Sequence, residues 1–364
     1  MNKRFLILGL LAAMLASAPA YADITIGLAG PLSGEYATLG EQIRNGAEQA
    51  VADINATGGI KGQKLVLHEG DDACDPKQAV AVANQMANAG VKFVVGHVCS
   101  GSSVPASKIY SEENILMVTP ISTNPILTEA GLTNVFRTCG RDDQEGAAQA
   151  RYVLKHLQDK KIGIVHDNTA VGLDLADQFK KHLNAGGVHE IVFDAYTPGE
   201  KDYSALVAKL KQSGVQVLVI GGYHVEVALI TRQIKQQAVD IQVISDDALA
   251  TPEFWSITGP MGEGVLFTFQ PDVSQRPDAK KVADEMHKAG RDATGYSYNA
   301  YAAVQVIAEG IQRVGTDPAK VATALRQKPV KTIMGTLGFD AKGDVKGDTF
   351  AIYRWHNGTY MEVE

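Results

Sequence analysis

The sequence predicts an α/β protein built from two doubly wound lobes. Short apolar strands alternate with amphipathic helices along most of the chain, and this alternation runs through two successive sets. The chain has 364 residues, which exceeds one ordinary domain of about 100 to 200 residues. Ligands of such sheets bind beyond the carboxyl ends of the strands, so two facing lobes would place their strand-end loops on opposite walls of one cleft.

The first set is predicted to contain four strands and three helices. Its strands are expected over 24–29, 65–68, 93–96 and 115–118, and its helices over 43–54, 76–89 and 105–112. Asp75 can cap the second helix, with Pro76 at the first helical position and Gly90 after its end. Gly58 and Gly59 end the first helix in the same way.

The second set is predicted to repeat this design. Its strands are expected over 161–166, 191–195, 215–220, 241–244 and 264–268, and its helices over 203–212 and 225–237. Three segments join a strand to a new set of elements and are candidate hinges between the lobes: Thr138–Asp142, Phe269–Pro271 and a stretch near Asp348.

The first 22 residues have the pattern of a secretory signal peptide. Lys3 and Arg4 precede an apolar stretch over 5–18, and Ala20-Tyr21-Ala22 has the form of a signal-peptidase site. The apolar stretch is shorter than the roughly 20 residues that span a bilayer. We therefore expect a mature chain that starts at Asp23 and works in the periplasm.

Net charge makes nucleic acid an improbable partner. Loss of the signal peptide changes the formal net charge from -7 to -9, and the remaining positive charges are scattered.

Three cysteines in an exported chain suggest one disulfide and one remaining thiol. Cys74 and Cys99 each follow a predicted strand, and we favour their pairing because neighbouring strand ends can bring them together. Closing that loop would stabilise the fold by about 3 kcal/mol. Cys139 is then interpreted as a small packed residue rather than a catalytic thiol.

Motifs of catalysis and of cofactor binding are missing from the sequence. It contains no phosphate-binding G-x-x-x-x-G-K-[ST], no H-E-x-x-H, no C-x-x-C and no G-x-S-x-G. The glycines of Gly27-Leu28-Ala29-Gly30 do not form G-x-G-x-x-G, and adjacent Asp71 and Asp72 are more typical of turns than of acid/base catalysis. We expect no enzyme activity, no cofactor and no metal.

Hydroxyl groups follow two neighbouring strands of the first set. Cys99-Ser100-Gly101-Ser102-Ser103 lies before the expected helix at Pro105, and Ile121-Ser122-Thr123-Asn124-Pro125 follows the next strand. Hydroxyls beside free backbone N–H groups suit a carboxylate, although simple N-capping by Ser102 or Ser103 is an equal alternative for the first loop alone. Two such loops on adjacent strands favour a binding site.

The second set offers partners for an ammonium group. Tyr223 follows the strand over 215–220, and Asp247 follows the strand over 241–244. An ammonium needs an anionic partner and gains from an aromatic face. Taken singly, a surface aromatic and a loop cap are the simpler interpretations of these two residues.

Several blocks resemble the periplasmic leucine/isoleucine/valine-binding proteins of ABC importers. The resemblance covers essentially the whole mature chain and is carried by residues 71–84, 96–100, 199–204, 221–224 and 339–344. It implies the type I periplasmic binding fold, an α/β fold of two doubly wound Rossmann-like lobes joined by a three-crossing hinge. We place the signal peptide at 1–22, one lobe at 23–140 with 271–348, and the other at 141–270 with 349–364. The family's disulfide falls on Cys74 and Cys99.

The resemblance also implies roles for nine residues in ligand binding. The hydroxyls of Ser100 and Thr123 would hold a carboxylate with Ser122 beside them, and the Ile121 carbonyl and Asp247 would meet the ammonium. Tyr223 and Tyr296 would line the second wall. The chain departs from the family at Leu39, where an aromatic is common, at Val171, where a Tyr is common, and at Asp247, where branched-chain binders carry Glu. These departures leave branched-chain amino acids and γ-aminobutyrate as competing ligands.

The leading hypothesis is an amino-acid-binding component of an importer, monomeric, whose partners are a small amino acid and the membrane permease and ATPase subunits. The alternative is a sensor of γ-aminobutyrate or another small amino acid that acts with a membrane receptor. An enzyme is the weakest hypothesis, because no nucleophile and base pair is visible. In either binding role, the ligand would stabilise the closed lobes through the extra contacts it makes there.

Overall fold

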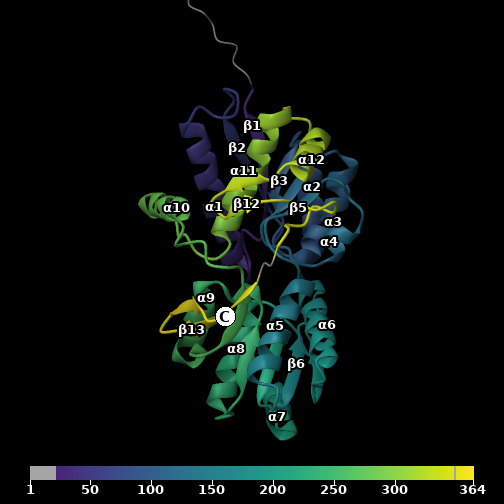
Figure 1. Cartoon of the computed structure of the whole chain (residues 1–364), viewed down its shortest axis with the longest axis vertical. Helices are drawn as coiled ribbons and strands as arrows, with labels where there is room; N and C mark the ends of the chain where they lie inside the picture. The colour runs from purple at the N-terminus through teal and green to yellow at the C-terminus, as the bar shows by residue number, and fades with distance from the viewer. Residues whose placement is uncertain (1–21, 348–349) are drawn as a thin grey trace, which may run out of the picture.

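The computed structural model describes residues 22–347 and 350–364, and Figure 1 shows their helices and strands in two groups stacked along the long axis of the molecule. We call the group that contains β1 the first lobe and the group that contains β6 the second lobe. The predicted signal peptide lies outside the described residues except for Ala22, and so does the candidate hinge residue Asp348. None of the described helices combines the length and the apolar character that a membrane span requires.

The first lobe is built on a parallel five-stranded sheet in the order β2-β1-β3-β4-β5. Its strands are β1 (Ile24–Gly30), β2 (Leu65–Asp71), β3 (Phe93–Gly96), β4 (Leu116–Thr119) and β5 (Val135–Arg137). One face of this sheet packs against α2 (Pro76–Asn88) and α3 (Ser100–Glu112). The other face packs against α1 (Ala37–Ala56) and α11 (Ser297–Val314), so an element late in the chain completes the first lobe.

The rest of the first lobe consists of short or late elements. They are α4 (Ile126–Glu129), α10 (Pro277–Lys288), α12 (Pro318–Gln327) and the hairpin β11 (Val330–Thr332) to β12 (Gly335–Leu337). The predicted cap of α2 is confirmed: Asp75 accepts hydrogen bonds from the backbone N–H groups of Lys77 and Gln78 at 2.9 and 2.8 Å.

The second lobe repeats the first design and extends it. Its seven-stranded sheet has the order β14-β13-β10-β9-β8-β6-β7. The strands are β6 (Ile162–His166), β7 (Val192–Ala195), β8 (Val217–Gly221), β9 (Gln242–Ser245), β10 (Leu266–Phe269), β13 (Ala351–His356) and β14 (Thr359–Glu362). The parallel part, β7-β6-β8-β9-β10, has the same order as the first sheet, whereas β13 and β14 are antiparallel.

Helices cover both faces of the second sheet. One face packs against α5 (Asp142–His156) and α6 (Ala170–Ala185), and the other packs against α7 (Ser204–Ser213), α8 (His224–Gln236) and α9 (Pro252–Thr258). The predicted α/β class with two doubly wound lobes is confirmed.

The structure corrects the predicted start of α3. The helix expected over 105–112 begins earlier, at Ser100, and Pro105 lies inside it. A proline lacks the N–H that would bond the carbonyl four residues earlier, so Pro105 removes one bond to Gly101 without ending the helix. Ser100 to Ser103 therefore form the first helical turn rather than a loop.

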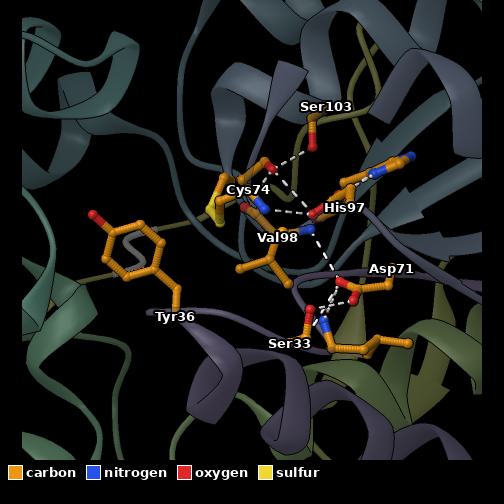
Figure 2. The surroundings of a disulfide bond; sticks show 12 residues. Ser33, Tyr36, Asp71, Cys74, His97, Val98 and Ser103 are labelled. Carbon is orange, nitrogen blue, oxygen red and sulfur yellow. Dashed lines mark hydrogen bonds and ion pairs between the residues drawn. A yellow bond between two sulfur atoms is a disulfide. The ribbon is translucent and has the colours of Figure 1, made fainter. Parts of the chain in front are cut away.

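The predicted disulfide is confirmed. Cys74 and Cys99 are bonded, with Cα atoms 5.5 Å apart, and Figure 2 shows Cys74 near Val98 and His97. His97 is buried and contacts the Asp72 carboxylate through Nδ1 at 2.5 Å and the Tyr110 hydroxyl through Nε2 at 2.8 Å. The disulfide thus joins the turn after β2 to the segment that leads into α3.

We expect Cys74 and Cys99 to resist alkylation in the folded, non-reduced protein, and Cys139 to react only after unfolding because it is buried. Replacing both disulfide cysteines by serine should lower the free energy of unfolding by about 3 kcal/mol, because the bond closes a loop of 25 residues. Mass spectrometry after thiol labelling and urea unfolding measure the two effects. Alkylation of Cys74 or Cys99 in the folded protein would exclude this pairing.

Candidate functional site

A small cavity of about 20 Å³ lies between the lobes at the carboxyl ends of their strands. From the first lobe, the segments after β1, β3 and β4 contribute Leu39, Val98, Ser100, Ile121 and Thr123. From the second lobe, the segments after β6, β8 and β9 contribute Val171, Gly222, Tyr223, Asp247 and Ala248. In sheets of this order, ligands bind beside the switch point between the first and third strands, and the cavity lies at that point in both lobes.

Seven of the nine residues expected to bind the ligand line this cavity. They are Leu39, Ser100, Ile121, Thr123, Val171, Tyr223 and Asp247. Val98, Gly222 and Ala248 line it as well and were missed. Each of these three lies within two residues of a predicted one. Their position near the end of a strand is the one sequence feature that could have identified them.

Ser122 serves the first lobe rather than the cavity. Its side chain is buried, its Oγ lies 2.5 Å from Ser103 Oγ, and it donates to the Val98 carbonyl at 2.8 Å. These bonds fix the segment after β4 against the first turn of α3. Ser122 therefore positions its neighbour Thr123.

One wall of the cavity is suited to a carboxylate. Ser100 is the first residue of α3, where backbone N–H groups without intrahelical partners and the helix dipole favour negative charge. Its Oγ accepts a hydrogen bond from the Asn124 N–H at 3.2 Å, which ties the two hydroxyl-bearing segments together. Thr123 is buried in the same wall.

Arg137 holds the segment that carries Thr123. This fully buried side chain donates to the carbonyls of Ser122 and Asn124 at 2.7 and 3.2 Å. Its Nε lies 2.6 Å from the carboxylate of Asp344, which also pairs with Arg141 at 2.8 Å. The cation thus joins the wall of the cavity to the segment around Asp344.

The opposite wall contains acidic side chains. Asp247 is only 5% exposed, and burial raises its pKa to about 7 even though the Tyr296 hydroxyl donates a hydrogen bond to it. The backbone N–H of Asp247 donates to Glu145 at 2.9 Å, and burial together with the charges of Asp247 and Asp246 raises the pKa of Glu145 well above its usual value. Burial and the Asp247 charge act on the pKa of Asp246 in the same direction. A cation placed against Asp247 would relieve this repulsion.

Tyr296 lies behind Asp247 and is not among the residues that line the cavity. Tyr296 immediately precedes α11 of the first lobe and is fully buried. Its hydroxyl contacts Asp247 of the second lobe, so this hydrogen bond joins the two lobes. The sequence analysis placed Tyr296 on the second wall. The structure gives it the role of orienting the acid.

Tyr223 forms the aromatic part of the second wall. Its ring contacts that of Tyr36 of the first lobe, with centroids 4.5 Å apart and the rings tilted by 35°. Figure 2 shows Tyr36 on the side of the disulfide where Cys74 lies. Gly222 has φ of 151°, and a Cβ there would lie 2.1 Å from the Tyr196 hydroxyl, so this position requires glycine.

Direct hydrogen bonds hold the lobes together around the cavity. Asn124 Nδ2 donates to the Ala170 carbonyl at 2.7 Å, and Gln42 Nε2 donates to the Ala250 carbonyl at 3.2 Å. The Thr38 hydroxyl of the first lobe also donates to the Glu253 carboxylate of the second lobe at 2.5 Å. A cavity of about 20 Å³ holds a single water molecule on the usual measure, so an amino acid can enter only when the lobes separate.

Metal binding and thiol chemistry are the two other possibilities to consider near this cavity. In the described part of the chain, no group of three or more His, Cys, Asp or Glu side chains is arranged to hold a metal ion. Cys139 is buried, and this burial raises the pKa of its thiol, which opposes formation of a reactive thiolate.

Comparisons with known proteins identify relatives of the chain. The family described as periplasmic binding protein matches residues 23–359. The Leu/Ile/Val-binding protein homolog 3 of Brucella melitensis is 47% identical over 348 residues and 95% of each chain. The Leu/Ile/Val-binding protein BraC3 of Rhizobium johnstonii is 46% identical over 358 residues, covering 97% of this chain and 98% of BraC3.

Solved structures show the same fold. The leucine binding protein LivK of Thermotoga maritima superposes with a TM-score of 0.86 at 25% identity, over 94% of this chain and 98% of LivK. An ABC transporter substrate-binding protein of Desulfitobacterium hafniense in complex with Leu has a TM-score of 0.78 at 28% identity, over 94% of this chain and all of that one.

Proposed function

Because the chain belongs to the periplasmic binding protein family, we propose that it captures leucine, isoleucine or valine between its lobes and delivers it to an ABC importer. The observation that carries this proposal is the pairing of two opposite walls around one cavity. One wall has hydroxyls and the start of α3, which suit a carboxylate, and the other has Asp247, which suits an ammonium. The names of the relatives and the leucine complex of the Desulfitobacterium protein support the same ligand class.

A zwitterion explains why both lobes take part. A buried charge is costly unless it is paired, so an amino acid must find partners for both of its charges when water is excluded. Ser100 and Thr123 belong to the first lobe, whereas Asp247 belongs to the second. Only the closed arrangement offers both sets at once, so the ligand stabilises closure.

The remaining lining residues suit an aliphatic side chain. Leu39, Val98 and Val171 line the cavity between the two polar walls. Each buried methylene contributes only about 0.8 kcal/mol, so discrimination among leucine, isoleucine and valine should be shallow.

We further propose that the lobes comprise residues 23–140 with 271–348 and residues 141–270 with 349–364. Opening would turn about the crossings at Thr138–Asp142 and Phe269–Pro271. Permease and ATPase subunits in the membrane would recognise the closed form in the periplasm, and the amino acid would be released unchanged.

Replacing Ser100 or Thr123 by alanine should weaken leucine binding by about tenfold or more, because a hydrogen bond to a charged group is worth about 1.5 to 3 kcal/mol. The ligand-free melting temperature should change little for Thr123→Ala. Calorimetric titration measures the affinity and thermal unfolding measures the stability. Wild-type affinity in both variants would mean that the carboxylate is held elsewhere.

Leucine binding should weaken as the pH falls below 7. The pKa of Asp247 is about 7 when the lobes are closed around the empty cavity, and the ammonium requires the ionised carboxylate. Above pH 7 the Asp247 carboxyl is already ionised, so leucine affinity does not change with pH. Below pH 7 this carboxyl must release its proton when leucine binds, so leucine affinity falls by up to about tenfold per pH unit. Titrations at pH 8 and pH 6, in buffers of different ionisation enthalpy, should show about tenfold weaker binding and the release of a proton at pH 6. Equal affinities without proton release would contradict the role of Asp247.

A further inference from the structure

A second and larger cavity lies where the two lobes meet, beside the crossing that follows β10. Its volume is about 480 Å³, and it shares no lining residue with the cavity described above. Its walls come from the crossing over 269–274, the segment over 293–299 that leads into α11, and the β13–β14 hairpin. Figure 1 shows these C-terminal strands, in yellow, next to the junction of the lobes.

The interior of this cavity is aromatic. Four aromatic side chains of its wall contact one another: Trp355 and Tyr360 at 5.1 Å between ring centroids, and Phe269 and Tyr353 at 6.1 Å. Tyr298 is a further aromatic residue of the wall. Flat rings on several sides favour an aromatic ligand.

Two buried N–H donors in the wall lack an acceptor within the described residues. They are Nε1 of Trp355, which is 1% exposed, and Nε2 of Gln270, which is 6% exposed. The Oε1 of Gln270 accepts from Asn299 at 2.8 Å, which fixes the orientation of the amide. Buried donors normally have partners. Both N–H groups are covered by neighbouring atoms, so a ligand oxygen reaches them only after a local shift of the wall.

The charged residues of the wall are acidic. Asp272 and Glu362 are exposed, and none of the described residues that line the cavity is Lys, Arg or His. Asp272 accepts from the Ser274 N–H at 2.7 Å, and Glu362 accepts from the Tyr353 hydroxyl at 3.1 Å. Carboxylates beside aromatic faces attract organic cations and repel anions.

We propose that this cavity is a second ligand site, for a small aromatic amine that carries a hydroxyl or carbonyl oxygen. The ring lies among the aromatic side chains, the oxygen accepts from Trp355 or Gln270, and the ammonium lies near Asp272 and Glu362. The volume is within the range of about 300 to 1,000 Å³ that is usual for small-molecule sites. Because both lobes contribute walls, the bound amine bridges them without occupying the amino-acid cavity.

Tyramine is the probe that tests this site, in a calorimetric titration of the mature protein with leucine kept at saturation. We expect saturable binding of one tyramine per chain. Asp272→Asn combined with Glu362→Gln should weaken it by about tenfold or more, since a charge-assisted contact is lost at each position. Phenethylamine, which lacks the hydroxyl, should bind at least about threefold more weakly, and benzoate should not bind.

The exposed Asp240, which does not line the cavity, provides the matched control. Asp240→Asn should leave tyramine affinity unchanged. Absence of tyramine binding at millimolar concentration, equal affinity in the doubly substituted protein, or displacement of tyramine by leucine would each overturn the proposal. Leucine titration alone tests the proposed amino-acid function, so the failure of one proposal is distinguishable from the failure of the other.

Discussion

Asp247→Asn should reduce leucine affinity more than any other single change in the cavity, by about thirtyfold to several thousandfold. Removing one partner of a buried charge pair costs about 2 to 5 kcal/mol, much of it because the other charge stays buried without a counter-ion. Asp247 is buried, lines the cavity, and is oriented by the Tyr296 hydroxyl from behind. Calorimetric titration with leucine measures the loss.

Stability of the ligand-free Asp247→Asn protein separates a binding role from a structural one. Burial raises the pKa of this acid, so its ionised form destabilises the ligand-free protein at pH 8. The neutral amide keeps an oxygen that can accept from Tyr296, and the free energy of unfolding at pH 8 should be unchanged or higher. The matched control is Asp240→Asn, an exposed site that should leave affinity unchanged. Near wild-type affinity in Asp247→Asn would show that the ammonium is held elsewhere.

Arg137→Ala should cause the largest loss of stability among substitutions at charged residues of the first lobe, about 3 to 5 kcal/mol. The substitution leaves the buried carbonyls of Ser122 and Asn124 without their donor and removes one of the two cationic partners of Asp344. Removing one partner of a buried ion pair typically lowers the free energy of unfolding by about 3 to 5 kcal/mol. Urea unfolding, followed by circular dichroism, measures the free energy of unfolding.

Leucine affinity should also fall in Arg137→Ala, because the segment that carries Thr123 loses the bonds that fix it. Arg137→Lys keeps the charge but not the fork of donors, and should recover only part of the stability. The surface control is Arg44→Ala, which breaks an exposed pair with Glu69 and should cost at most about 1 kcal/mol. Equal losses in Arg137→Ala and Arg44→Ala would show that Arg137 does not hold the wall.

Local patterns were sufficient to predict most of the parallel strands and several of the helices between them, but not β5 or α6. The capping of α2 by Asp75 depends on residues close in sequence, and so does the alternation of strands and helices in the two sets. The antiparallel strands β13 and β14 were not predicted, because their place beside β10 depends on a pairing between segments about 85 residues apart, such as Leu266 with Arg354. The packing of α11 on α1 is of the same non-local kind.

Some residues of the site could be predicted from the sequence, and the roles of others could not. Tyr223, Asp247 and the two hydroxyl-bearing segments were predicted from position and chemistry, whereas Ser100 and Thr123 were singled out by the family resemblance. The roles of Ser122 and Tyr296 depend on which way the side chains point, and the sequence cannot specify that direction. Arg137 and Glu145 were missed because the sequence does not show which buried groups a charged residue will meet.

Leucine titration of the mature protein, after unfolding and refolding to remove bound ligand, tests the central claim most directly. We predict that one leucine binds per chain at pH 8, that isoleucine and valine compete with it at similar affinity, and that γ-aminobutyrate competes only weakly. If γ-aminobutyrate binds and leucine does not bind at millimolar concentration, the claim of a branched-chain ligand held between the two walls is wrong.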